Sequence, residues 1–146
     1  MHTTHHPDPR LDTQFYDGVP AKRLVAWVLD LIVVIGICLA CIIASLGLMA
    51  FFIPLLALAA NFCYRSFCLH KWSATLGMRA LGIEVRNTNG DRLTTTQALF
   101  HTGLFIFIFM SVLGIFANIL SILLNDKGQA LHDLLLGTVV INCPAD

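Results

Sequence analysis

Three long apolar segments, separated by shorter polar stretches, dominate the pattern along the chain. They run from about residue 24 to 46, 52 to 67 and 98 to 124. A helix needs roughly 20 apolar residues to cross a bilayer, so the first two segments are long enough to predict one span each. Gly47 and Pro54 lie between them and are typical of a turn that is followed by a new helix. The first two segments therefore predict a transmembrane hairpin.

The third apolar segment, Ala98 to Leu124, is too long for one upright span and too short for two. As a helix that rises ~1.5 Å per residue it would measure about 40 Å, against a hydrocarbon core of about 30 Å. Two alternatives follow: one long tilted helix, or a bent or re-entrant pair broken near Gly114. In both, the fold class is an all-α membrane protein with three apolar helical segments.

The polar loop between the second and third segments predicts a small β-hairpin. In the stretch GIEVRNTNGDRLT, Ile83 and Val85 alternate with charged residues, and Asn89-Gly90 favours a tight turn. The β-branched run Thr138 to Ile141 offers another partner strand for Ile83–Arg86. That second pairing requires the C-terminal tail to lie on the same side of the membrane as the loop.

Composition supports the membrane class: 57% of the 146 residues are hydrophobic and only 12% are charged, whereas ordinary soluble domains are roughly 25% charged. The net charge of zero gives no reason to expect nucleic acid as a partner. The polar residues 1–19 predict a disordered N-terminal tail without a signal-peptide core. We expect one domain over residues 20–142, followed by a short tail at 143–146.

The placement of positive charge predicts the orientation. Lys and Arg side chains flank the first two apolar segments, which indicates that the N-terminus and the polar loop are cytoplasmic. We therefore expect a multi-pass protein of a bacterial-type inner (plasma) membrane. The flanking cations are Lys22, Arg23, Arg65, Lys71, Arg79, Arg86 and Arg92.

Asp30 is the only charged residue between Arg23 and Arg65. It lies about 10 Å beyond Arg23 along a helix, below the lipid head groups, where an ionisable side chain marks a functional or pairing site. Arg23 shares its helix face but is too far away for direct contact, so Asp30 needs another partner. The candidates are His101, Asn61, Asn118 or a residue of the tail.

The remaining polar residues give weaker indications of a functional site. The pair His132-Asp133 can bind an ion, relay protons or pair with arginine, although such a pair more often caps a helix. His101 can titrate near neutral pH. The N-terminal histidines, Cys38-x-x-Cys41 and Cys63-x4-Cys68-x-His70 do not match metal-site or redox patterns. We expect no metal and no cofactor. No nucleophile stands out beside these groups, so we also expect no enzymatic activity.

Three ordered motifs resemble the RDD family of small membrane proteins, which is named for one arginine and two aspartates. PAKRLVAWVLDLIVV is similar to the start of the family's first helix, where the arginine and first aspartate match Arg23 and Asp30. SATLGMRALGIEV resembles its loop, and KGQALHDLLLGTVVI resembles its C-terminal signature, where the second aspartate matches Asp133. His101 and Lys127-Gly128-Gln129 stand where members often carry arginines.

The resemblance implies the membrane architecture and suggests transport of an unidentified ligand. We expect a transport or transport-accessory protein for an ion or small ligand, with Arg23, Asp30 and Asp133 as its functional charges and His101, His132 and Asn61 as supporting residues. Three short helices cannot enclose a pathway, so the bilayer-embedded chain would need a homo-oligomer or another membrane protein as partner. The alternative is a non-transporting assembly module, in which the acids lock helices together.

Overall fold

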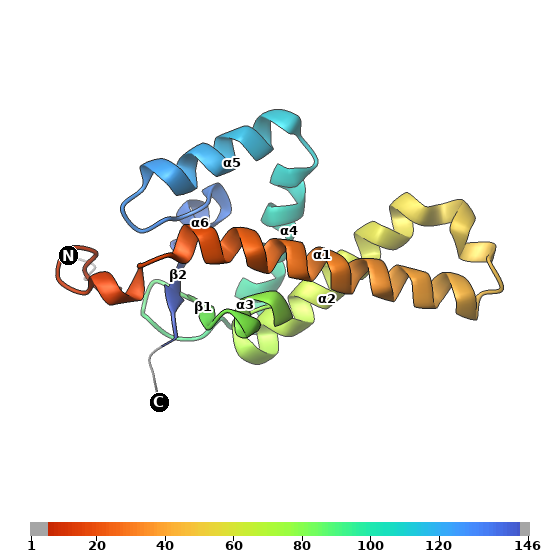
Figure 1. Ribbon diagram of the computed structural model, residues 1–146, viewed down its shortest axis with the longest axis horizontal. Helices are drawn as coiled ribbons and strands as arrows, with labels where there is room; N and C mark the ends of the chain where they lie inside the picture. The colour runs from red at the N-terminus through yellow and green to blue at the C-terminus, as the bar shows by residue number, and fades with distance from the viewer. Residues whose placement is uncertain (1–5, 144–146) are drawn as a thin grey trace.

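The computed structural model describes residues 6–143, which are mostly helical (Figure 1). Helices α1 (Val19–Ala44) and α2 (Ile53–Trp72) form a hairpin whose far end projects away from the rest of the molecule. A short 3-10 helix, η2 (Leu48–Phe52), joins them. Both arms are long and apolar enough to cross a membrane, which confirms the predicted hairpin.

Local chemistry explains the ends of the hairpin. Gly47 adopts the left-handed backbone conformation, with a φ of 88°, that glycine tolerates best. Pro54 lies in the first turn of α2, where its missing N–H leaves no helical hydrogen bond unmade. Helix α2 continues beyond the predicted end at residue 67, so Tyr64 and Arg65 lie inside the helix and not at its exit.

A short helix, α3 (Leu76–Ala80), packs tightly against α1. Thr75 caps it, because its side chain accepts a hydrogen bond from the Met78 N–H. Gly77 permits the close approach: a Cβ at this position would lie 2.2 Å from the carbonyl oxygen of Ala26. The Thr-x-Gly motif therefore positions the Gly77 N–H against the first helix and the Leu76 N–H against Tyr64 of the second.

Two strands form a small antiparallel sheet, as predicted. Strand β1 (Ile83–Arg86) pairs with β2 (Val139–Asn142), and Val85 lies opposite Val140. The partner is thus the C-terminal strand, which the sequence offered as an alternative, and not the residues that follow Asn89-Gly90. The C-terminal strand contributes three buried β-branched side chains to the core, whereas the chain after that turn begins with the exposed Asp91 and Arg92.

The N-terminal segment packs beside this sheet. After a 3-10 turn, η1 (Thr13–Phe15), Tyr16 is buried against Val139 and Ile141. The Lys22 ammonium donates a hydrogen bond of 2.6 Å to the Asn142 side chain. Residues 6–18 thus have a defined place where the sequence predicted a disordered tail, while residues 1–5 and 144–146 lie outside the described part. The N-terminal segment, the loop and the C-terminal strand all lie at one end of the hairpin.

The third apolar segment is a bent pair. The chain bends by 116° between helices α4 (Thr95–Phe109) and α5 (Val112–Leu124), so the alternative of one tilted helix is wrong. A sixth helix, α6 (Leu131–Leu136), then packs against both of them. Thr95 at the start of α4 contacts His70 near the end of α2, and α6 leads directly into β2. The pair therefore begins and ends on the side of the sheet.

The bend depends on Ser111 and Gly114. Ser111 caps α5, because its side chain accepts a hydrogen bond of 3.3 Å from the Gly114 N–H. A Cβ on Gly114 would lie only 2.2 Å from the carbonyl oxygen of Ile108 at the end of α4. The break comes a few residues before Gly114, and this glycine allows the two helix ends to approach each other.

We expect Gly114→Ala to destabilise the protein by about 1–3 kcal/mol, because the new methyl group forces the bend to open. Thermal unfolding in detergent, followed by circular dichroism, measures the change. Gly103→Ala is the matched control, since a Cβ there meets nothing within 4 Å and alanine favours a helix. Equal stability of the two variants would contradict the role given to Gly114.

Candidate functional site

Asp30 joins three helices. It lies in α1 and is only 5% exposed. Its Oδ1 atom accepts a hydrogen bond of 2.5 Å from the Tyr64 hydroxyl of α2 and one of 2.9 Å from the Gly77 N–H of α3. One oxygen of Asp30 is therefore well satisfied by neutral donors.

The other oxygen of Asp30 faces Arg65 more loosely. Its Oδ2 atom lies 3.8 Å from Arg65 Nη1, beyond hydrogen-bond distance. The Arg65 guanidinium is also 3.7 Å from the centre of the Phe105 ring, a cation–π contact between α2 and α4. Among the described residues, the buried Nε atom of Arg65 has no hydrogen-bond partner. Arg65 is thus a buried cation with unused donor capacity.

Asp133 is the centre of a second network and is fully buried. Its Oδ1 atom accepts a hydrogen bond from the Thr138 hydroxyl and lies 2.9 Å from His101 Nε2. Its Oδ2 atom accepts one from the Ala130 N–H, at the start of α6. Arg23 Nη1 lies 2.6 Å from the same oxygen and forms an ion pair with it. The pair connects the first helix with the last.

The second network contains an ionised acid beside a neutral imidazole. Burial opposes the charge on Asp133, but the Arg23 guanidinium and the hydrogen bond with His101 outweigh it and keep the pKa of this carboxyl well below its usual range. Burial lowers the pKa of His132 well below its usual value, and the nearby Asp133 only partly opposes this shift. At neutral pH the acid is charged and the His132 ring is not.

The two histidines lie edge to face, with ring centres 4.7 Å apart. The Nδ1 atoms of both are buried and have no hydrogen-bond partner among residues 6–143. His101, His132 and Asp133 each bring one possible metal-ligand atom to within 4.8 Å of the others. A metal ion bound there would lie beside the Arg23 guanidinium, which already pairs with Asp133 and would repel a second positive charge.

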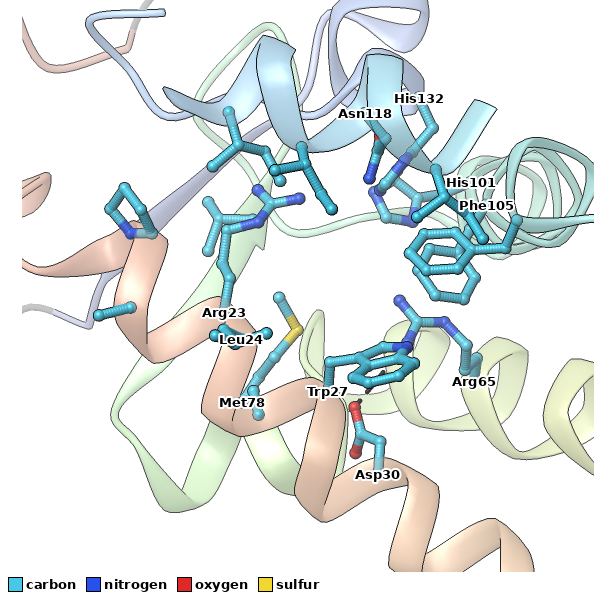
Figure 2. Close-up of a pocket in the computed structure, with 18 of the residues that line it drawn as sticks. Arg23, Leu24, Trp27, Asp30, Arg65, Met78, His101, Phe105, Asn118 and His132 are labelled. Carbon is cyan, nitrogen blue, oxygen red and sulfur yellow. Dashed lines mark ion pairs between the residues drawn. The ribbon is translucent and has the colours of Figure 1, made fainter. Parts of the chain in front are cut away.

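A cavity of about 610 Å³ lies between these two networks (Figure 2). Arg23 and Arg65 point into it from different sides, and the histidines close it from α4 and α6. Most of the remaining lining is apolar and comes from α1, α4 and α5. The polar side chains that line the cavity are Arg23, Asp30, Arg65, His101, Asn118 and His132.

The structure gives Asp30 other partners than the sequence predicted. His101 and His132 surround Asp133, and Asn118 accepts a hydrogen bond from the Leu131 N–H. Among the described residues, no hydrogen bond joins Asn61 or the tail to Asp30, whose partners are Tyr64, Gly77 and Arg65. Arg23, which was expected to lie too far from Asp30 for direct contact, pairs with Asp133. Asn61 does not line the cavity.

The sequence pattern did not identify Tyr64 and Arg65 as partners of Asp30. It placed the end of the second helix near residue 67, so these two residues were interpreted as marking the exit from the membrane. One signal was available: the stretch from Ser66 to Trp72 contains no glycine or proline that would end a helix after Arg65.

We expect Asp133→Asn to destabilise the protein by about 3–5 kcal/mol, because it leaves the Arg23 guanidinium without its counter-charge in a buried place. Unfolding in detergent measures the loss. The double variant Arg23→Met with Asp133→Asn is the control, since it leaves neither charge unpaired and should recover part of the stability. A double variant no more stable than Asp133→Asn alone would contradict the ion pair.

Stability should also fall as the pH is lowered from 7.5 to 5.5. Unfolded His132 takes up a proton near its ordinary pKa of 6.5, whereas the folded ring does not, so acid favours the unfolded state. The slope from one such group is at most about 1.4 kcal/mol per pH unit. Asp133 does not contribute in this window, because its stabilisation is lost only below its ordinary pKa of 3.8.

The measurement compares His132→Asn with the parent in a series of thermal unfolding curves. Burial also lowers the pKa of His6, so both proteins carry His6→Asn. His132→Asn should show a flatter dependence on pH, and an unchanged slope would contradict a neutral buried His132.

Comparison with known proteins agrees with this architecture. The model of the RDD family matches residues 18–137, a range that covers most of the chain and includes Arg23, Asp30, Arg65 and Asp133, the four charged residues of the two networks. No curated protein and no solved structure matches the chain. The chain is a membrane protein of the RDD family.

Proposed function

We propose that this protein binds an ion or small ligand in the membrane-embedded cavity and acts in transport, either directly or as an accessory subunit. We propose no enzymatic role. Asp30 is the intramembrane acid of this function, and the network of Arg23 and Asp133 forms the opposite wall of the same space.

The loose contact between Asp30 and Arg65 is the observation that carries the proposal. An acid buried only for stability would be expected to make a close ion pair, yet Oδ2 of Asp30 lies 3.8 Å from Arg65. Asp30 and Arg65 both line the cavity, so a ligand there can reach both charges. Ionisable side chains inside membranes commonly mark such ligand or ion pathways.

The proposed location is a bacterial-type inner membrane, with the N-terminus and the sheet in the cytoplasm. The support is the concentration of Lys and Arg around the end of the hairpin that carries the sheet, for example Lys22, Lys71 and Arg79. The C-terminal strand belongs to the same side because it pairs with β1.

A partner is part of this proposal. A hairpin and one bent pair do not surround a continuous pathway, and both arms of the hairpin expose large apolar side chains along most of their length. We propose that lipid covers part of this surface and that a second copy of the chain, or another membrane protein, covers the rest.

A locking role is the second candidate. Its support is Oδ1 of Asp30, which ties α1 to α2 through Tyr64 and to α3 through Gly77. In this role Asp30 stabilises the packing of the helices, and the protein transports no ligand. Interhelical hydrogen bonds in membranes contribute only about 0.6–2 kcal/mol each, so the gain would be modest for a buried acid.

Asp30→Asn distinguishes the two candidates, because asparagine preserves size and hydrogen bonding but not the titratable charge. The assay measures flux of protons and monovalent cations into liposomes that contain the purified protein, with a pH-sensitive dye inside. Transport predicts a flux that Asp30→Asn reduces at least 10-fold while thermal stability stays near that of the parent.

Two further variants control the assay. Asp91→Asn removes an exposed acid that does not line the cavity and should leave flux unchanged. Tyr64→Phe removes a hydrogen bond to Asp30 without removing charge, so it tests the lock. Absence of proton and monovalent-cation flux, with Asp30→Asn and Tyr64→Phe merely less stable, would reject transport of these ions in favour of the lock.

A further inference from the structure

The charged side chains that line the cavity indicate the chemical class of its ligand. Its polar lining contains two guanidinium groups, Arg23 and Arg65, and one carboxylate, Asp30. Asp133, which balances Arg23, lies behind the wall and does not line the space. The four charges of the two networks balance, but more guanidinium than carboxylate groups reach the surface of the cavity, which favours a ligand that accepts charge-assisted hydrogen bonds.

The donors that remain unused also favour an anion. Nε of Arg65 is buried without a hydrogen-bond partner among the described residues, and this side chain is only 6% exposed. The guanidinium points into the cavity, as does that of Arg23 (Figure 2). Arginine binds carboxylates well because its planar N–H groups match two oxygens. A carboxylate between the two guanidiniums would accept hydrogen bonds from those N–H groups of Arg23 and Arg65 that line the cavity.

The rest of the lining selects an apolar body for the ligand. Leu24 and Trp27 of α1 line the space together with Phe105 and Phe109 of α4 and the apolar side of α5. The rings of Trp27 and Phe109 stack, with their centres 6.3 Å apart. A small hydrated anion would lose its water there without enough replacement contacts. The volume of about 610 Å³ lies within the range of small-molecule sites, roughly 300–1,000 Å³, and suits one hydrocarbon chain better than a whole two-chain phospholipid.

The bilayer is the source of such a ligand. The side chains that form the margin of the cavity are themselves exposed and apolar: Leu24 is 64% exposed, Ile119 49% and Leu123 69%. They belong to the apolar helices α1 and α5, whose outer faces are suited to lipid tails. A molecule can thus move from the membrane into the cavity without leaving an apolar environment.

We propose that the cavity binds a single-chain amphiphile with a carboxylate head group, of the fatty-acid type, taken from the bilayer. The carboxylate lies between Arg23 and Arg65, and the chain extends between α1 and α5 past Trp27 and Ile119. This inference builds on the proposed function, since it names the ligand class of the same cavity. The binding step can be measured whether or not ions are transported.

The test uses the full chain in detergent, with palmitate as probe and native mass spectrometry to count bound molecules. We expect one palmitate per chain. Hexadecanol has the same chain without the charge, and acetate has the same head group without the chain, so both should bind about 10- to 100-fold more weakly. A phospholipid that binds better than palmitate, or equal binding of hexadecanol and palmitate, would overturn the proposal.

Two pairs of variants separate binding from folding. Ile119→Trp fills the cavity and should weaken palmitate and hexadecanol together by at least 10-fold, whereas Leu120→Trp, at the next and similarly exposed position of α5, does not line the cavity and should change neither. Arg65→Met should remove most of the preference of palmitate over hexadecanol, and Arg65→Lys should restore part of it. A general loss of structure would lower the apparent affinity for palmitate and for hexadecanol by the same factor, so the ratio of the two affinities would not change.

The outcomes remain distinguishable from those of the flux assay. Palmitate binding that responds to Ile119→Trp, without ion flux, supports this inference and rejects ion transport. Ion flux without any palmitate binding rejects this inference and leaves the proposed transport in place. Equal effects of Ile119→Trp and Leu120→Trp would show that the amphiphile lies elsewhere on the helices and would also overturn it.

Discussion

The rest of the structure depends on the need to pair charges that cannot reach water. Arg23 and Asp133 are both buried or nearly so, and each would be very unfavourable there alone. Their contact brings the first helix against the last, and the partners of Asp133 then position α4 through His101 and the start of β2 through Thr138. One ion pair thus organises the end of the molecule that carries the sheet.

Asp30 shows a different use of the same constraint. Its first oxygen is satisfied by Tyr64 and Gly77, and the absence of a side chain on Gly77 is what lets α3 come close enough to donate. Its second oxygen shares Arg65 with the Phe105 ring and with the cavity. Hydrogen bonds therefore fix the Oδ1 atom of Asp30, whereas its Oδ2 atom can still bind a ligand in the cavity.

Much of the fold could be predicted because membrane solvation leaves few choices. Apolar length specified the hairpin, and the need to satisfy backbone groups in lipid made helices the only option for it. The site was harder. Arg23, Asp30, His101, His132 and Asp133 were recognised as individual residues, but their pairing depends on where α2 ends and where α4 bends. Arg65 seemed to mark the exit of a helix, and only its position in three dimensions makes it a partner of Asp30. The steric contact of Gly114 with Ile108 likewise has no signature in the sequence beyond the glycine itself.

The pairing of β1 with β2 has a consequence for how the protein is made. Strand β1 is synthesised early, yet its only partner within residues 6–143 is the strand that ends at Asn142. Asp133, the counter-charge of Arg23, also comes from this late part of the chain. During synthesis the hairpin can insert while Arg23 is still unpaired and the edge of β1 is open, and contacts over such long sequence separation form slowly. The segment that carries Asp133 and β2 therefore completes the fold, and a chain interrupted before it would leave a strand edge unpaired and the Arg23 charge unmatched.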